Sequence, residues 1–117
     1  MEKSQDELVR AYARLSALRK NIDQMTVYNV LETYVHEFHS VLDRLEGIGK
    51  DVSEFRIQGS LIKPLITSKR MDGTRSYSEQ KYVDKSYLLF KIDAILGYFK
   101  IITAEKPKRI GFTKSND

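Results

Sequence analysis

The residues with the clearest chemical spacing are two imidazoles and two carboxylates that recur at steps of four, three and four positions. This spacing places them along one side of an α-helix. Imidazole and carboxylate groups together can bind Zn²⁺, Mn²⁺ or Fe²⁺, so the set is a candidate metal site. Its members are Glu32, His36, His39 and Asp43.

The same residues also fit a solvated helix face, where pairs four positions apart, such as Glu32 and His36, stabilise the helix. Four ligands along one helix span about 16 Å. A single ion could therefore take only two of them unless Asp84 or Asp93 joined from another helix. The two histidines are also three residues apart, and not four as in the zincin helix motif. We therefore predict a polar helix flank with no bound metal or cofactor.

Nucleophilic catalysis has little support in the sequence. The chain has no cysteine, which excludes thiol nucleophiles, disulfides and cysteine-bound metals. It has no G-x-S-x-G motif around a serine. Gly47 and Gly49 lack the following helix of a phosphate-binding loop, and they better fit the end of a helix. We expect a protein that is not an enzyme.

Positive charge is concentrated in the second part of the chain. Residues 1–49 hold 6 basic and 8 acidic side chains, whereas residues 50–117 hold 14 and 8. Such asymmetry suits nucleic-acid binding, with Tyr77 and Phe112 available to stack on bases. It equally suits two faces of a self-complementary oligomer, and a solvated surface rich in lysine is the commoner explanation. No helix-turn-helix, basic-zipper or RNA-binding sheet signature is present. The candidate contacts to an anion or nucleic acid are Lys69, Arg70, Arg75, Lys106, Lys108 and Arg109.

A long amphipathic helix is predicted at the N-terminus. Ser4 and Glu7 form a capping-box pattern, and no proline or glycine occurs before Gly47. One continuous helix over residues 4–46 is therefore expected, with a break near residues 21–26 as the alternative, because the apolar repeat slips there. Before the slip, a heptad-like seam consists of Leu8, Ala11, Leu15, Leu18, Ile22 and Met25.

The predicted connection over residues 50–77 is irregular. Its Asp72-Gly73 pair allows a short hairpin between residues 65–71 and 74–77, although an isolated two-stranded ribbon is marginal in water. A helix over 78–104, apolar around most of its circumference, should follow and end before Pro107. The basic tail 107–117 should be flexible.

These elements predict an all-α fold with one helical domain over residues 1–106. The narrow seam and the apolar last helix exceed what one subunit can bury, so we expect two subunits to form a helical bundle. A cytosolic, non-enzymatic scaffold with an unknown protein partner is the first expectation. Nucleic-acid binding is the first alternative function, and metal binding is the second alternative. No membrane span is expected. The predicted dimer interface comprises Leu8, Ala11, Leu15, Leu18, Ile22, Met25, Leu89, Leu96 and Phe99.

Overall fold

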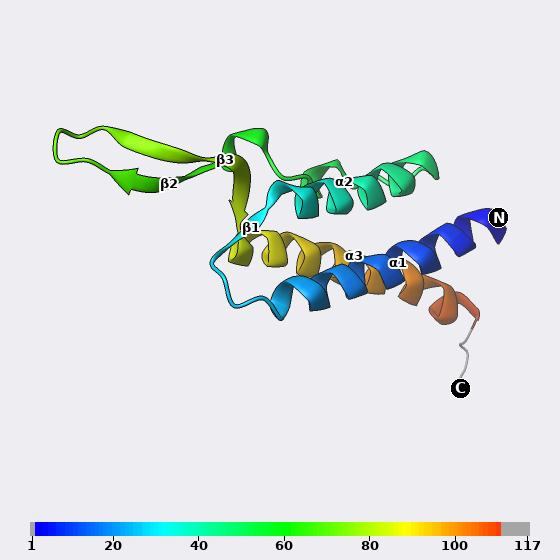
Figure 1. The fold of residues 1–117 in the computed structure, drawn as a ribbon. Helices are drawn as coiled ribbons and strands as arrows, with labels where there is room; N and C mark the ends of the chain where they lie inside the picture. The colour runs from blue at the N-terminus through cyan, green and yellow to red at the C-terminus, as the bar shows by residue number, and fades with distance from the viewer. Residues whose placement is uncertain (1, 111–117) are drawn as a thin grey trace.

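In the computed structural model, the described residues 2–110 form three α-helices and a three-stranded antiparallel sheet (Figure 1). The structure describes the backbone of residues 2–110 and the side chains of residues 5–102. The predicted all-α class is therefore wrong. In chain order the elements are α1 (Glu2–Asp23), β1 (Asn29–Leu31), α2 (Glu32–Gly47), the single-turn 3-10 helices η1 (Ser53–Phe55) and η2 (Gly59–Leu61), β2 (Lys63–Lys69), β3 (Arg75–Asp84) and α3 (Lys85–Ile110).

The predicted continuous helix over 4–46 is also wrong, and the break lies in the region that the alternative named. Helix α1 ends at Asp23, and β1 then pairs antiparallel with the last residues of β3, Val30 opposite Val83. The Lys85 ammonium donates hydrogen bonds to the carbonyls of Asp23 and Met25, which suits the negative end of the α1 dipole. Pairing with a strand more than fifty residues away thus replaces the local helical preference.

The predicted last helix begins later than expected because residues 75–84 form β3. The Asp84 carboxylate accepts the Tyr87 backbone N–H at 2.9 Å, and so caps the first turn of α3. The helix also continues through Pro107 to Ile110, beyond its predicted end at residue 104. The predicted flexible tail from residue 107 therefore begins inside α3, and residues 111–117 lie outside the described residues.

The connection over 50–77 is less irregular than predicted, since the alternative hairpin forms there with longer strands. Strands β2 and β3 pair antiparallel on either side of the Asp72-Gly73 turn. Gly73 has a φ of +93°, a conformation that glycine adopts without strain. The Thr74 backbone N–H donates to the Asp72 carboxylate at 2.9 Å, which closes the turn.

Helix α1 packs against both other helices and runs antiparallel to each of them (Figure 1). Its Tyr12 ring meets Phe99 of α3 edge-on, with 5.7 Å between the ring centroids, and Arg19 donates to Asp93 at 2.6 Å. Near the start of α1, the Glu7 carboxylate lies 3.7 Å from the guanidinium of Arg44 at the end of α2. Helix α3 therefore packs along α1.

The subunit covers the α1 seam with its own chain. A single core joins all three helices, the sheet and the loop after α2, and it includes Leu15, Ile22, Phe38 and Val83. The need for a partner subunit to bury this seam therefore disappears. Within the described residues, no helix is long and apolar enough to cross a membrane.

Two isoleucines test the position of the core. Ile22 is fully buried in α1, whereas Ile101 on α3 is 63% exposed. Ile22→Ala should lower the free energy of unfolding in urea by about 2–5 kcal/mol, because it leaves a cavity, and Ile101→Ala should lower it by less than about 1 kcal/mol. Equal losses from the two substitutions would contradict this packing.

Candidate nucleic-acid interface

A β-hairpin projects from the helices as an arm, which we define as residues 63–81 (Figure 1). Strand β1 covers only residues 82–84 of β3, so the arm continues beyond it as a two-stranded ribbon. Every residue from 66 to 77 is exposed. The molecule measures 72 × 26 × 20 Å, and its radius of gyration of 18.9 Å exceeds the roughly 13 Å of a compact domain of this length.

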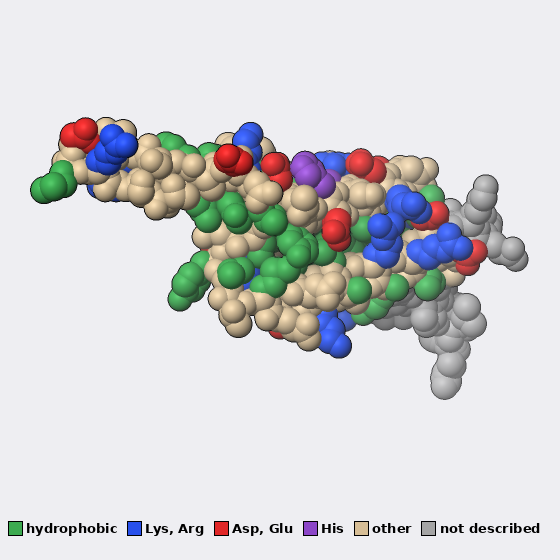
Figure 2. Space-filling model, viewed as in Figure 1, with side chains coloured by type: hydrophobic (Ala, Val, Ile, Leu, Met, Phe, Trp, Pro, Cys, Tyr) green, Lys and Arg blue, Asp and Glu red, His purple; other side chains and the backbone are tan. Residues whose placement is uncertain are grey.

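Three basic residues crowd the tip of the arm, and we call Lys69, Arg70 and Arg75 the tip cations. Lys69 and Arg75 stand directly opposite each other in the strand register, and Arg70 enters the turn beside them. Asp72 is the acidic residue of this turn, and its hydrogen bonds with Thr74 lower its pKa, so it stays ionised at neutral pH. Figure 2 shows basic and acidic side chains together at the far end of the arm.

The arm is irregular where its strands leave the helices. The register shifts between Pro64 and Ile66 and again between Ile66 and Ser68. At the first shift, the Ser78 hydroxyl accepts the Leu65 backbone N–H at 2.9 Å and donates to the Gln80 carbonyl at 2.6 Å. The Ser78 side chain therefore takes the place of a regular ladder partner at a point where the ladder is disrupted.

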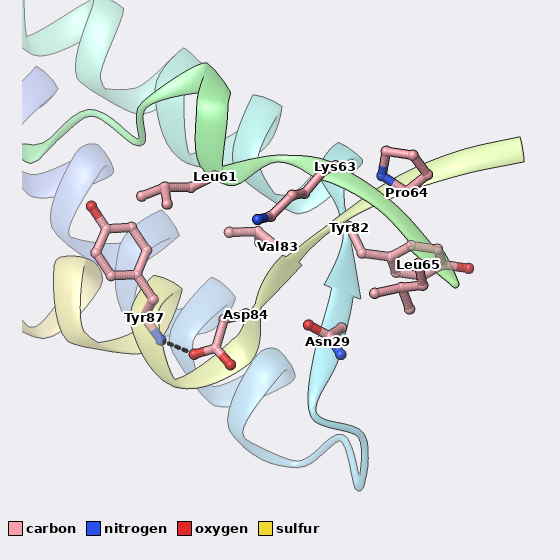
Figure 3. A pocket seen from close by; sticks show the side chains of 9 residues that line it. All are labelled: Asn29, Leu61, Lys63, Pro64, Leu65, Tyr82, Val83, Asp84 and Tyr87. Atoms are coloured by element: carbon pink, nitrogen blue, oxygen red, sulfur yellow. Dashed lines mark hydrogen bonds between the residues drawn. The ribbon is translucent and has the colours of Figure 1, made fainter. Parts of the chain in front are cut away.

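A pocket of about 350 Å³ lies in the corner between the arm and the helices, and we call it the corner pocket (Figure 3). Figure 2 shows hydrophobic side chains gathered in this corner. Four separate segments meet here: β1, η2 with the start of β2, the end of β3, and the first turn of α3. Its lining residues are Asn29, Leu61, Lys63, Pro64, Leu65, Tyr82, Val83, Asp84 and Tyr87.

Two tyrosines and a lysine give the corner pocket its chemistry. Tyr82 lies on the arm side and Tyr87 on the helix side, and the Lys63 side chain extends between them (Figure 3). The Lys91 ammonium lies 5.9 Å from the centre of the Tyr87 ring and also donates to the Glu54 carbonyl at 2.9 Å, so it holds this ring in place. Among the described side chains, none forms an ion pair with Lys63.

The residues of the candidate metal site on α2 are engaged separately. The His36 Nε2 atom lies 3.5 Å from the Glu32 carboxylate, which confirms the predicted pairing of these two residues four positions apart. Asp43 pairs instead with Arg56, which also donates to Glu46 at 2.8 Å. No three histidine, aspartate or glutamate side chains gather closely enough to share an ion in the part of the chain that the structure describes.

The two aspartates that could have completed that metal site are also engaged elsewhere. Asp84 caps α3 through the Tyr87 backbone N–H. Asp93 binds the Arg19 guanidinium, and this ion pair raises the pKa of Arg19.

His39 has a structural role that the sequence did not indicate. Its Nε2 accepts the backbone N–H of Ile57 at 2.9 Å, which ties the loop after α2 to the helix. Burial lowers the pKa of the half-buried His39 below 6.5, and the Arg56 and His36 charges lower it further while Asp43 opposes them. A neutral imidazole is required here, since protonated Nε2 could not accept this hydrogen bond.

The other predicted site residues divide into three groups. Among the predicted interface residues, Ala11, Leu15, Leu18, Ile22 and Phe99 are buried inside the subunit, and Leu8, Met25, Leu89 and Leu96 are partly buried against its core. The three tip cations are exposed together. The side chains of Lys106, Lys108 and Arg109, and all of Phe112, lie outside the described residues.

Sequence reasoning missed the corner pocket. Tyr82 and Tyr87 had been read as part of one apolar helix, whereas they lie in a strand and in the helix that follows it. Comparison with family models, with curated proteins and with solved structures gave no match to this chain.

Acid should destabilise the protein through His39. The unfolded chain has a histidine pKa of about 6.5, so as the pH falls it takes up the proton before the folded protein does. The free energy of unfolding should therefore fall from about pH 6.5 down to the lower folded pKa, with no further loss from this group below it. Urea titrations between about pH 7.5 and pH 5 measure this loss.

His39→Gln should show a smaller loss over the same range, because an amide oxygen can accept the Ile57 N–H without titrating. His36→Gln is the matched control. His36 is 66% exposed and its charge is the smallest of the causes that act on the pKa of His39, so most of the loss should remain. An unchanged pH profile in His39→Gln would contradict the role of His39.

Proposed function

We propose that this protein binds nucleic acid through the arm and does so without catalysis. The observation that carries the proposal is the direct opposition of Lys69 and Arg75, next to Arg70, on a solvated ribbon. Like charges opposite each other destabilise an antiparallel pair, and an isolated ribbon is already marginal. The tip cations therefore do not serve the fold, and an anionic partner would relieve their repulsion.

The charge along the whole arm supports a polyanion as that partner. The arm carries five basic and two acidic residues, and Lys63 and Lys81 place two of these charges near its base. A span of seven strand residues is about 23 Å long. A nucleic-acid backbone offers phosphates along such a length, so binding should be electrostatic, sensitive to salt and weakly sequence-specific.

The open edges of the arm are poorly suited to adding a strand from a protein partner. Lysines and bulges on an edge strand oppose pairing with another strand. Lys63 and Lys69 lie on β2, and both register shifts fall within the arm. This argues against the arm as a strand-exchange element and leaves its charged side chains as the means of binding.

The first sequence-based expectation was a self-associating scaffold, and its main physical reason has gone. The seam from Leu8 to Met25 packs inside the subunit. Self-association stays a prediction with no assigned interface. We place the binding function in the cytosol, where a chain without cysteine would have no disulfide to maintain.

Neutralising the tip cations should weaken binding to random-sequence nucleic acid. The triple variant Lys69→Gln, Arg70→Gln and Arg75→Gln should lose at least about tenfold in affinity near 100 mM salt. The slope of log K against log salt should become shallower by about 2, since roughly three phosphate contacts are lost. Fluorescence anisotropy with a labelled oligonucleotide measures both.

The matched control removes the same charge from α1, through Arg10→Gln, Arg14→Gln and Lys20→Gln. These side chains are exposed on the bundle, away from the arm. The control should keep most of the affinity. Equal losses in the two triple variants would show that net charge, and not the arm, determines binding, and no binding at low salt would remove the proposed function.

A further inference from the structure

We infer that the corner pocket holds one unpaired base of the strand that the arm binds, so that the preferred ligand is single-stranded nucleic acid. This inference rests on the proposed function and makes it more specific. The starting point is that the pocket lies at the base of the arm and shares Lys63, Pro64, Leu65 and Tyr82 with it. A strand that lies along the arm from the tip cations therefore reaches Lys63 and the pocket at the base of the arm.

The lining of the pocket matches the parts of a nucleotide. Tyr82 and Tyr87 offer two aromatic rings, and a base stacks on such rings whatever its sequence. Leu61, Pro64 and Leu65 add apolar surface around them. The volume of about 350 Å³ lies at the lower end of ligand pockets, which suits a single planar group better than a folded peptide segment.

The polar groups of the pocket match the phosphate and the base edge of a nucleotide. The Lys63 ammonium extends between the two tyrosines, where it can meet a phosphate (Figure 3). The Asn29 side chain also lines the pocket and can both donate to and accept from a base edge. The Asp84 carboxylate is already committed to the Tyr87 backbone N–H, so it holds the first turn of α3 and leaves recognition to Lys63 and Asn29.

Tyr87 is the better base platform because its ring is held from outside the pocket. Lys91 lies against this ring and is itself tied to the Glu54 carbonyl. A ring that is already fixed loses less conformational entropy when a ligand stacks on it. A paired base in a duplex cannot enter this pocket without first leaving its stack, so the inference predicts discrimination between single and double strands.

The decisive quantity is the ratio of single-strand to duplex affinity, measured by anisotropy with a labelled oligothymidine and a duplex hairpin of equal charge. The unmodified protein should prefer the single strand. Tyr87→Leu should lower the ratio by about 5- to 100-fold, the range expected for loss of one stacked base. Tyr87→Phe keeps the ring and should restore most of the ratio.

Tyr12→Leu is the matched control, since Tyr12 packs on Phe99 in the bundle and lines no part of the pocket. It should leave the ratio unchanged. The tip-cation triple variant should lower the affinity for the single strand and for the duplex by similar factors. This separates the two proposals: a loss confined to the tip variant supports arm binding and overturns the pocket, and no binding of either ligand overturns both.

Photo-crosslinking gives a second readout that needs no substitution. An oligonucleotide with a photoreactive thymidine analogue should form adducts on the tryptic peptides of residues 82–85 or 86–91, which contain Tyr82 and Tyr87. Adducts confined to the tip of the arm, or equal binding of single strand and duplex, would overturn the inference.

Discussion

The pairing of three residues of β1 with the last three residues of β3 is the constraint on which the rest of the structure depends. It joins the first part of the chain to the last, Val30 opposite Val83, and both side chains enter the core. It also fixes where helices can begin, because α2 starts directly after β1 and α3 directly after β3. At Tyr82 both neighbouring strands meet β3, and beyond that point the ribbon continues with only β2 beside it.

This pairing also explains which parts of the fold the sequence could predict. Local signals raised the Asp72-Gly73 hairpin and a helix break near residues 21–26 only as alternatives, and the structure contains both. The strand over residues 75–84 was misread in part as helix, because Tyr82 and Val83 continue the apolar pattern of the residues after them. Residues 75–82 pair with the nearby strand β2, whereas residues 82–84 also pair with Asn29–Leu31, more than fifty residues away, and periodicity carries no information on such a distant partner.

The candidate site likewise has one part that the sequence predicted and one part that it did not. The tip cations are close in sequence, and the turn between them was recognisable, so their shared surface could be predicted from the residues alone. The corner pocket could not, because four segments meet there and its two tyrosines lie on either side of a strand-to-helix junction. The histidine face on α2 was predicted as a polar flank, but its regular spacing gave no sign that His39 accepts the Ile57 backbone N–H, because that contact comes from a loop outside the helix.

The central claim is that the arm is a solvated ribbon that a polyanion engages, while β1 and β3 hold its base. Hydrogen exchange of the backbone amides, with and without a single-stranded oligonucleotide, tests this most directly. In the free protein the amides around Val30 and Val83 should exchange slowly and those of residues 66–77 rapidly, and the oligonucleotide should slow exchange in the arm. Slow exchange throughout the arm in the free protein, or an arm unaffected by the oligonucleotide, would contradict the account.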